Sequence, residues 1–250
     1  MLAPRSRGRA FTHVGRRDRN EDAYVCAPEL GLYAVADGIG GMPGGDVASA
    51  VAIGAFHTFF RTIPALDHLD GRQARSILGA AVARARDAVR ERARGPLRDM
   101  GTTLSALWVG TRSATVAHIG DTRIYRVRAG GIERLTLDHS VGGLSELLGI
   151  AAPPQGLGRA LTRALSHTCD PTPELHSFPL RAKDLFVLCS DGVSEPLGDD
   201  GLREVLGRTS TAEAARALVE EALRRGGTDN ATAVVVGVRR RLASSLVAVV

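Results

Sequence analysis

The chain of 250 residues contains few cysteines and no long apolar run. An odd number of cysteines without C-x-x-C spacing argues against both a disulfide framework and a zinc site: Cys26, Cys169 and Cys189. No apolar stretch approaches the ~20 residues that cross a bilayer, and the first residues lack the apolar segment of a signal peptide. We therefore expect no membrane contact and a cytoplasmic location.

Lysine is almost absent, so arginine carries nearly all of the positive charge. The formal net charge is +5, and Lys183 is the single lysine. Such a charge could indicate nucleic-acid binding, but the densest arginine run, residues 84–94, alternates with alanine and has no aromatic side chain for base stacking. We interpret this run as the solvated face of a helix and expect no nucleic-acid partner.

The apolar pattern predicts an α+β protein. Apolar residues recur at helical spacing over residues 46–60 and 72–94, and the S-x-x-E capping box at residues 210–213 predicts a further helix that ends near residue 226. Short apolar or alternating runs predict strands at residues 31–36, 103–109, 114–119, 123–127, 132–135, 184–190 and 231–238. Because strands and helices do not alternate regularly, we expect helices packed outside antiparallel sheets.

The pattern indicates one domain, because no linker or internal repeat interrupts it. Residues 1–10 are short and polar, and we expect them to be loose. Residues 11–239 are expected to form the domain, and residues 240–250 a short tail.

Four aspartates share one position, at the end of a strongly apolar strand or just before its beginning: Asp37, Asp121, Asp191 and Asp229. A carboxylate at the rim of a packed sheet loses hydration, and two that are ~5 Å apart repel by about 3 kcal/mol at an effective dielectric near 20. A bound cation would remove that cost. Oxygen ligands without histidine or thiolate favour Mg²⁺ or Mn²⁺ over Zn²⁺ or Cu²⁺. One Asp-Gly alone is usually a turn, so the prediction depends on the set of four.

An ordered series of short motifs resembles the PPM/PP2C family of metal-dependent Ser/Thr phosphatases, in its short bacterial form. Residues 15–23 are similar to the family's G-x-R-x-x-N-E-D-A, and residues 35–41 to its V-A-D-G-x-G-G. The remaining motifs follow in the family's order, at residues 101–103, 120–125, 136–140, 161–165, 188–192 and 227–232. Each motif alone is weak, whereas their order over residues 12–238 is highly specific.

This resemblance implies a four-layer α-β-β-α fold, an antiparallel β-sandwich flanked by α-helices. It also implies a protein phosphatase that hydrolyses phosphoserine and phosphothreonine. Two Mn²⁺ or Mg²⁺ ions would activate a bridging water, which attacks phosphorus directly without a phosphoenzyme. The substrates would be phosphorylated proteins, made by a Ser/Thr kinase, and the enzyme would act as a monomer.

The resemblance also assigns roles to residues. Asp37 would bridge the two ions, and the carbonyl of Gly38 would help to hold one of them. Asp191 and Asp229 would complete the other, and a third, weaker ion would use Asp121 together with Asp191. Asp22 would also belong to the metal site, acting through metal-bound water, and Glu21 and Asn230 would lie behind the ligands. Arg17 would bind the substrate phosphate, which suits a planar guanidinium with paired donors.

Two departures from the family pattern limit what the resemblance implies. Many eukaryotic relatives have a histidine directly after the D-G, proposed as the general acid, where this chain has Ile39. The proton donor is therefore not identified, and we interpret His139 as a structural histidine rather than a substitute. The segment 141–159, in the place of the family's flap, is rich in glycine and proline, so substrate choice cannot be predicted from the resemblance.

Two other functions are compatible with parts of the sequence. A non-catalytic member of the family would bind phosphoproteins or scaffold a kinase, but such members usually lose metal aspartates, and none is missing here. The glycine-rich stretch 38–45 could suggest a nucleotide loop. It lacks the G-x-x-x-x-G-K-[ST] pattern and follows the aspartate, so a tight turn is favoured.

Overall fold

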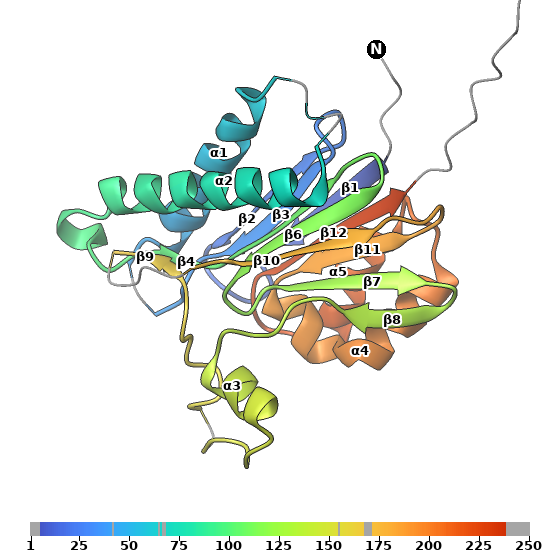
Figure 1. Ribbon diagram of the computed structural model, residues 1–250. Helices are drawn as coiled ribbons and strands as arrows, with labels where there is room; N and C mark the ends of the chain where they lie inside the picture. The colour runs from blue at the N-terminus through green and yellow to red at the C-terminus, as the bar shows by residue number, and fades with distance from the viewer. Residues whose placement is uncertain are drawn as a thin grey trace, which may run out of the picture.

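The structure is a computed structural model that describes residues 6–41, 43–64, 66, 69–154, 156–167 and 172–238. Two five-stranded sheets pack face to face, and all of their strand pairs are antiparallel (Figure 1). The first sheet has the order β1 (Ser6–His13), β12 (Ala231–Val238), β11 (Leu185–Cys189), β7 (Arg123–Arg128), β8 (Gly131–Arg134). The second has the order β10 (Glu174–Pro179), β6 (Ser113–Ile119), β5 (Leu104–Val109), β3 (Leu32–Asp37), β2 (Asp22–Ala27).

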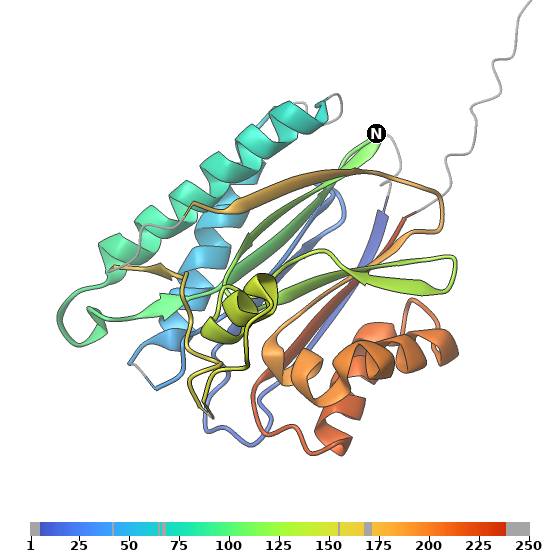
Figure 2. The ribbon, with the colours of Figure 1, turned by 60° about the horizontal axis from the view of Figure 1, so that its bottom comes forward.

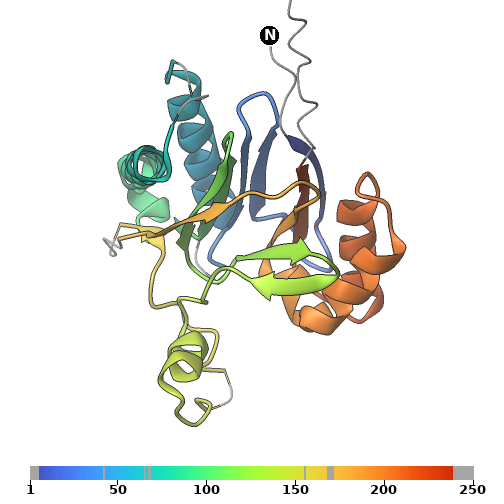
Figure 3. The same ribbon diagram turned by 45° about the vertical axis from the view of Figure 1, so that its right-hand side comes forward.

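Helices cover the outer face of each sheet, as Figures 2 and 3 show. The second sheet packs against α1 (Gly45–Arg61) and α2 (Gly71–Arg92), and the first against α4 (Asp191–Arg208) and α5 (Ala214–Arg224). The remaining elements are the 3₁₀ turn η2 (Gly95–Leu97), the short helix α3 (Val141–Leu148) and the small sheet of β4 (Gly101–Thr102) with β9 (Leu165–Ser166). The predicted four-layer α-β-β-α class is confirmed. None of the described helices has both the length and the apolar composition of a membrane span.

Three layers of buried side chains hold the sandwich together, and the alternation of strand residues explains them. In β3, Leu32, Ala34 and Ala36 face the helices, whereas Tyr33 and Val35 face the opposite sheet. Strand β11 divides in the same way, with Val187 and Cys189 toward α4 and α5, and Phe186 and Leu188 between the sheets. Because successive side chains of a strand point to opposite faces, a continuous apolar run predicts a strand covered on both sides.

The prediction that residues 1–10 are loose is wrong for residues 6–10, which form the first half of β1. This strand pairs with β12 from Ser6 opposite Val238 to His13 opposite Ala231. In this strand the exposed Arg7 and Arg9 alternate with buried positions, a pattern that the polar composition did not reveal. Ser6 is buried, and its hydroxyl bonds to the Tyr33 hydroxyl at 2.8 Å. Residues 1–5 and the predicted tail 240–250 lie outside the described residues.

Candidate metal and phosphate site

The predicted site residues lie at the same edge of the sandwich because their strands end or begin there. In the second sheet, the last residue of β3, Asp37, is opposite the first residue of β2, Asp22. In the first sheet, β11 ends at Cys189 opposite the start of β7, and Ser190 N donates to Thr232 O in β12 at 3.1 Å. The turns that carry Asp121, Asp191 and Asp229 therefore meet at this edge.

A cavity of about 780 Å³ opens at this edge. The end of β3, the loops beside the first sheet, the start of α4 and the segment 156–166 line it. All predicted site residues except Asp22 lie on its wall: Arg17, Glu21, Asp37, Gly38, Asp121, Asp191, Asp229 and Asn230. The structure therefore brings side chains from distant parts of the chain to one cavity.

Asp22 does not line this cavity; the residue is partly buried, and its Oδ1 atom is fully enclosed. Its Oδ2 accepts a hydrogen bond from Ser190 Oγ at 2.8 Å, while its Oδ1 is buried without a hydrogen-bond partner among the described residues. Burial raises the pKa of this carboxyl to about 7, and the charges of Asp191 and Asp229 add to the shift. An unpartnered carboxylate oxygen at this depth is a free acceptor for a cation or a bridging water.

The carboxyl groups at the cavity raise one another's pKa values. Burial raises the pKa of Asp37 well above its ordinary value, and the charges of Asp22 and Asp191 raise it further. Burial is also the main cause of the raised pKa of Asp191, followed by the charge of Asp229. Asp121 has a pKa raised to about 7, again by burial first and by Asp191 second. A cluster of carboxyl groups with raised pKa values binds protons or cations more readily than it remains fully ionised and unpaired.

The chemistry of these residues fits hard divalent cations. As the side chains lie, however, no three acidic, histidine or cysteine side chains of the described chain are arranged to hold one ion. Asp229, for example, accepts a hydrogen bond from the Arg17 guanidinium at 2.6 Å. Cation binding would thus require the carboxylates to draw closer. The oxygen-only donor set, the unpartnered Asp22 Oδ1 and the mutual repulsion all favour such binding.

Backbone contacts fix Asp37 at the end of β3. Its N–H donates to Thr103 Oγ1 at 2.9 Å, and its carbonyl accepts from Thr102 Oγ1 at 2.8 Å and from Thr103 N at 2.9 Å. Both threonines are buried. The G-T-T motif at residues 101–103 therefore positions Asp37, a role that the motif alone did not show.

Arg17 lies at the mouth of the cavity with half of its side chain exposed. Its exposed fraction is 53%, and its partner Asp229 is itself 31% exposed. One edge of the guanidinium is directed to Asp229, which leaves other N–H donors for an anion in the cavity. The pKa of Arg17 is raised, mainly by the hydrogen bond to Asp229.

Asn230 connects the loop that carries Arg17 and Glu21 to the start of β12. Its Oδ1 accepts from Glu21 N at 2.8 Å, and its Nδ2 donates to the carbonyls of Val14 and Arg19, both at 2.8 Å. All side-chain polar atoms of this buried amide are thus used. Asn230 positions the loop, and Glu21 contributes a carboxylate to the cavity wall.

His139 does not line the cavity but supports its floor. Its Nδ1 accepts from Gly120 N at 3.2 Å, so Nε2 carries the proton and lies 3.0 Å from Glu174 Oε1. The backbone of His139 also bonds to Gly120 O at 2.7 Å and to Thr162 N at 2.8 Å. This histidine therefore joins the turn before Asp121 to both ends of the segment 141–159.

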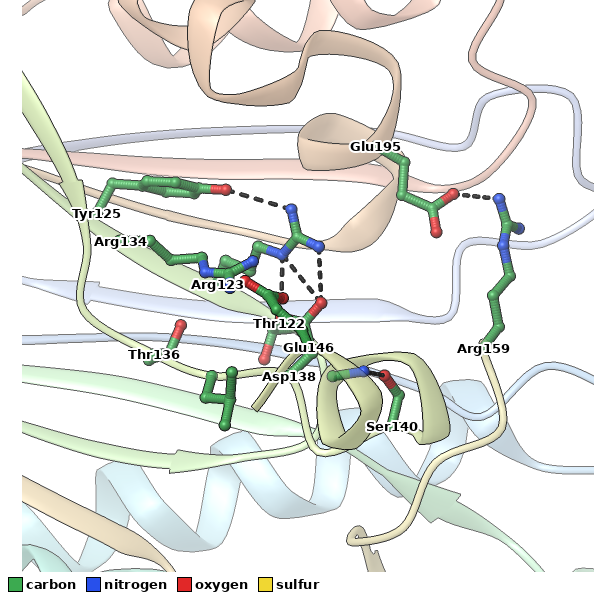
Figure 4. A network of polar contacts seen from close by, with 12 residues as sticks. Thr122, Arg123, Tyr125, Arg134, Thr136, Asp138, Ser140, Glu146, Arg159 and Glu195 are labelled. Carbon is green, nitrogen blue, oxygen red and sulfur yellow. Dashed lines mark hydrogen bonds and ion pairs between the residues drawn. The ribbon is translucent and has the colours of Figure 1, made fainter. Parts of the chain in front are cut away.

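Two arginines of the cavity wall were not predicted, Arg159 and Arg163. Arg159 forms an ion pair with Glu195 of α4, and Figure 4 shows it reaching across to that helix. The same view shows Arg123 bound to Asp138, whose Oδ2 lies 2.6 Å from the guanidinium. This nearly buried pair anchors the segment that leads into α3.

Comparisons with known proteins agree with this geometry. The family model described as Protein phosphatase 2C matches residues 8–233. The serine/threonine protein phosphatase PstP of Mycobacterium tuberculosis is 35% identical over 236 residues, which cover 89% of this chain but 43% of that protein. The chain thus spans less than half the length of this relative.

Solved structures are similar over nearly the whole chain. The crystal structure of the M. tuberculosis phosphatase PstP/Ppp has a TM-score of 0.84 at 33% identity, over 94% of this chain and 99% of that one. The catalytic domain of PstP, solved in complex with two manganese ions, has a TM-score of 0.83 at 34% identity with the same coverage of both chains.

Proposed function

The chain belongs to the protein phosphatase 2C family, and we propose that it hydrolyses phosphoserine and phosphothreonine on proteins with the help of two divalent ions. The observation that carries this proposal is that four of the predicted aspartates and Arg17 line one cavity of about 780 Å³, with the enclosed Asp22 close to them: Asp37, Asp121, Asp191 and Asp229. The two manganese ions of the similar catalytic domain support the number of ions. The ions would be Mn²⁺ or Mg²⁺.

Each predicted site residue has a proposed role. Asp37 and the Gly38 carbonyl would hold ions together with Asp191 and Asp229, and Asp22 with Glu21 would support them from below. Asp121, with Asp191, would hold a third, weaker ion. When bound, the ions acidify a water and offset the charge of the phosphoryl group.

The protein's own groups would orient the substrate. Arg17 would direct two parallel N–H donors at the phosphate oxygens, and its contact with Asp229 holds it at the mouth of the cavity. Hydrogen bonds to Thr102 and Thr103 fix the position of Asp37. Asn230 fixes the loop that carries Arg17 and Glu21.

Phosphoproteins made by a Ser/Thr kinase are the proposed substrates. A single domain that contains residues 11–239, the monomeric state and the cytoplasmic location belong to the same proposal.

Metal removal tests this function directly. We expect Mn²⁺-dependent hydrolysis of p-nitrophenyl phosphate that EDTA abolishes and that excess Mn²⁺ restores. The alternative, a non-catalytic phosphoprotein-binding member of the family, would bind Mn²⁺ in calorimetry but would release no p-nitrophenol at any metal concentration.

Replacing Arg17 by alanine is expected to raise KM for p-nitrophenyl phosphate about tenfold or more, because a charge-assisted hydrogen bond contributes about 1.5–3 kcal/mol. Weaker inhibition by inorganic phosphate should accompany the change. The matched control is Arg16→Ala, since Arg16 is exposed and does not line the cavity. Equal kinetic constants for Arg17→Ala and the wild type would remove Arg17 from the site.

A further inference from the structure

A short motif outside the cavity wall holds the stretch of chain that carries Asp121. This stretch, which we call the Asp121 segment, is residues 118–124 and leads from β6 in one sheet to β7 in the other. The motif, residues 136–139, follows β8 and does not line the cavity. Each of its residues contacts the segment: Thr136, Leu137, Asp138 and His139. These contacts indicate a role for a motif to which the family resemblance assigned none.

Two of the contacts fix the end of the segment where β7 begins. Thr136 is buried, and its Oγ1 accepts from Ile124 N at 3.1 Å. The carboxylate of Asp138 accepts from the Arg123 guanidinium at 2.9 and 2.6 Å, as Figure 4 shows. Because water has little access to these groups, their hydrogen bonds are stronger than those of an exposed site.

A chain of buried side chains fixes the residue directly after Asp121. Burial lowers the pKa of His118 to about 3, so its ring is neutral. Its Nε2 donates to Leu137 O at 2.8 Å, and its Nδ1 therefore accepts from Ser105 Oγ, also at 2.8 Å. Ser105 Oγ lies 2.8 Å from Thr122 Oγ1 as well. Thr122 is thereby connected to the motif.

His139 fixes the residue directly before Asp121. Its Nδ1 accepts from Gly120 N at 3.2 Å, and its backbone N–H donates to Gly120 O at 2.7 Å. The ring itself is buried, with Nε2 at 3.0 Å from Glu174 Oε1 and with its centroid 4.6 Å from that of the His118 ring. Both backbone polar groups of Gly120 are therefore bonded to one immobilised histidine.

Gly120 also joins the Asp121 segment to the residues that position Asp37. It has φ 107°, and a β-carbon placed on it would lie 2.5 Å from Thr103 Cβ. The glycine backbone therefore packs directly on Thr103, whose Oγ1 accepts from Asp37 N at 2.9 Å. In so tightly packed an interior, a displacement of Gly120 would move Asp121 relative to Asp37.

The backbone of His139 is held on its other side by the chain beyond the flap, which we define as residues 141–159. Its carbonyl accepts from Thr162 N at 2.8 Å, and the next residue, Ser140, forms a β-bridge with Leu161 of the cavity wall. With its backbone and its Nε2 both held, the ring presents Nδ1 to Gly120 in one position.

We propose that His139 is a positioning residue for Asp121: by holding Gly120, it sets the place of the Asp121 carboxylate and so strengthens the binding of the third, weaker ion. This inference rests on the proposed function. Loss of a group that holds a metal ligand in place typically weakens metal binding about 10–100-fold. The two tighter ions should be bound equally well without His139, because hydrogen bonds to Thr102 and Thr103 fix Asp37 separately.

The test replaces His139 by leucine and by asparagine. Leucine has no acceptor for Gly120 N, whereas the side-chain oxygen of asparagine can take the place of Nδ1. In calorimetry we expect His139→Leu to bind two Mn²⁺ ions as the wild type does and a third about tenfold or more weakly. His139→Asn should restore most of this affinity, a rescue that a role in packing alone would not produce.

Hydrogen exchange in EDTA, followed by mass spectrometry, provides a readout without metal. Peptides that contain residues 118–124 should exchange faster in His139→Leu, because the amide of Gly120 loses its acceptor, and as in the wild type in His139→Asn. The matched control is His176→Ala. His176 of β10 also lies beside Glu174, with Nε2 at 3.9 Å from Oε2, but its side chain is 54% exposed and it does not belong to the motif. This change should alter neither exchange nor ion binding.

A second variant tests the inference even if His139→Leu does not fold. Glu174→Ala changes a partly exposed side chain and removes the partner of His139 Nε2. It should weaken the third ion in the same direction as His139→Leu, though by a smaller factor. Circular dichroism of each metal-free variant shows whether it is folded.

Three results would overturn the inference: a third ion bound as tightly by the folded His139→Leu or Glu174→Ala as by the wild type, an asparagine variant as defective as the leucine variant, or a wild type that hydrolyses p-nitrophenyl phosphate but binds only two Mn²⁺ ions. In each of these cases a phosphatase with two ions still stands. A wild type that neither binds Mn²⁺ nor hydrolyses p-nitrophenyl phosphate would instead contradict the proposed function itself.

Discussion

Replacing Asp37 by asparagine is expected to lower turnover by about 10³-fold or more while the protein remains folded. A neutral amide binds a hard cation poorly, and loss of several kcal/mol of charge stabilisation corresponds to this factor at about 1.4 kcal/mol per tenfold. The fold should tolerate the change because the hydrogen bonds of Asp37 to Thr102 and Thr103 involve its backbone. Steady-state hydrolysis of p-nitrophenyl phosphate with saturating Mn²⁺ measures the rate, and calorimetry measures Mn²⁺ affinity.

Asp99 provides a matched control for this substitution. Its side chain also lines the cavity, but it is exposed and follows η2 rather than a strand of the sandwich. Asp99→Asn removes the same charge from the same cavity and should change turnover less than about twofold. If Asp37→Asn were as active as Asp99→Asn, the assignment of Asp37 to the metal centre would be wrong.

The edge of the sandwich was predictable because strand ends are visible in the sequence. Apolar runs ending at Asp37 and Asp191 show where a buried strand stops, and the structure places both aspartates at one cavity. Their roles as metal ligands stay a prediction. Asp22 was assigned by the resemblance alone, and its burial beneath the cavity could not be deduced from its polar neighbours Asn20 and Glu21.

One helix, α4, was missed and the start of another, α5, was misplaced because the local sequences resemble turns. The pair Asp191-Gly192 was interpreted as the end of a strand, whereas α4 begins there. Pro196 and Gly198 argue against a helix in the sequence, and the structure has a kink at Gly198 (φ 59°, ψ 177°). The helix predicted from residue 210 begins at Ala214 instead, since Ser210 bonds through its side chain to Glu213 ahead of the first turn.

The flap contained two signals that were overlooked. Ser140 before α3 is a good N-cap residue, and Gly149 after it is a typical C-terminal stop, so an eight-residue helix could have been predicted between them. The position of Arg159 and Arg163 at the cavity could not have been predicted. It depends on the tertiary path of the flap, which contacts such as His139 O with Thr162 N determine.

Without metal, the protein should become less stable as the pH rises from 6.5 to 8. Asp22 and Asp121 have pKa values of about 7 in the folded protein, above the ordinary value of 3.8. The folded state therefore binds their protons more tightly, so their contribution to stability is present at low pH and is lost as the pH passes through 7. The opposing groups are His118, whose pKa burial lowers to about 3, and His139, whose pKa burial also lowers. They reduce stability mainly below their ordinary value of 6.5, so they offset only a small part of the fall above it.

Thermal unfolding in EDTA at pH 6.5 and 8 measures this effect. Together the two carboxyls contribute about 1–2 kcal/mol over this range, which corresponds to a fall in Tm of roughly 5 °C. Mn²⁺ at a hundred times its dissociation constant should add about 2.7 kcal/mol at pH 8, because the cation replaces the missing protons. Asp121→Asn should reduce the fall, whereas the control Asp99→Asn should not. A Tm in EDTA that is constant or rises over this range would show that burial and mutual repulsion do not raise the pKa values of these carboxyls in the folded protein. The cluster would then have no electrostatic reason to bind a cation.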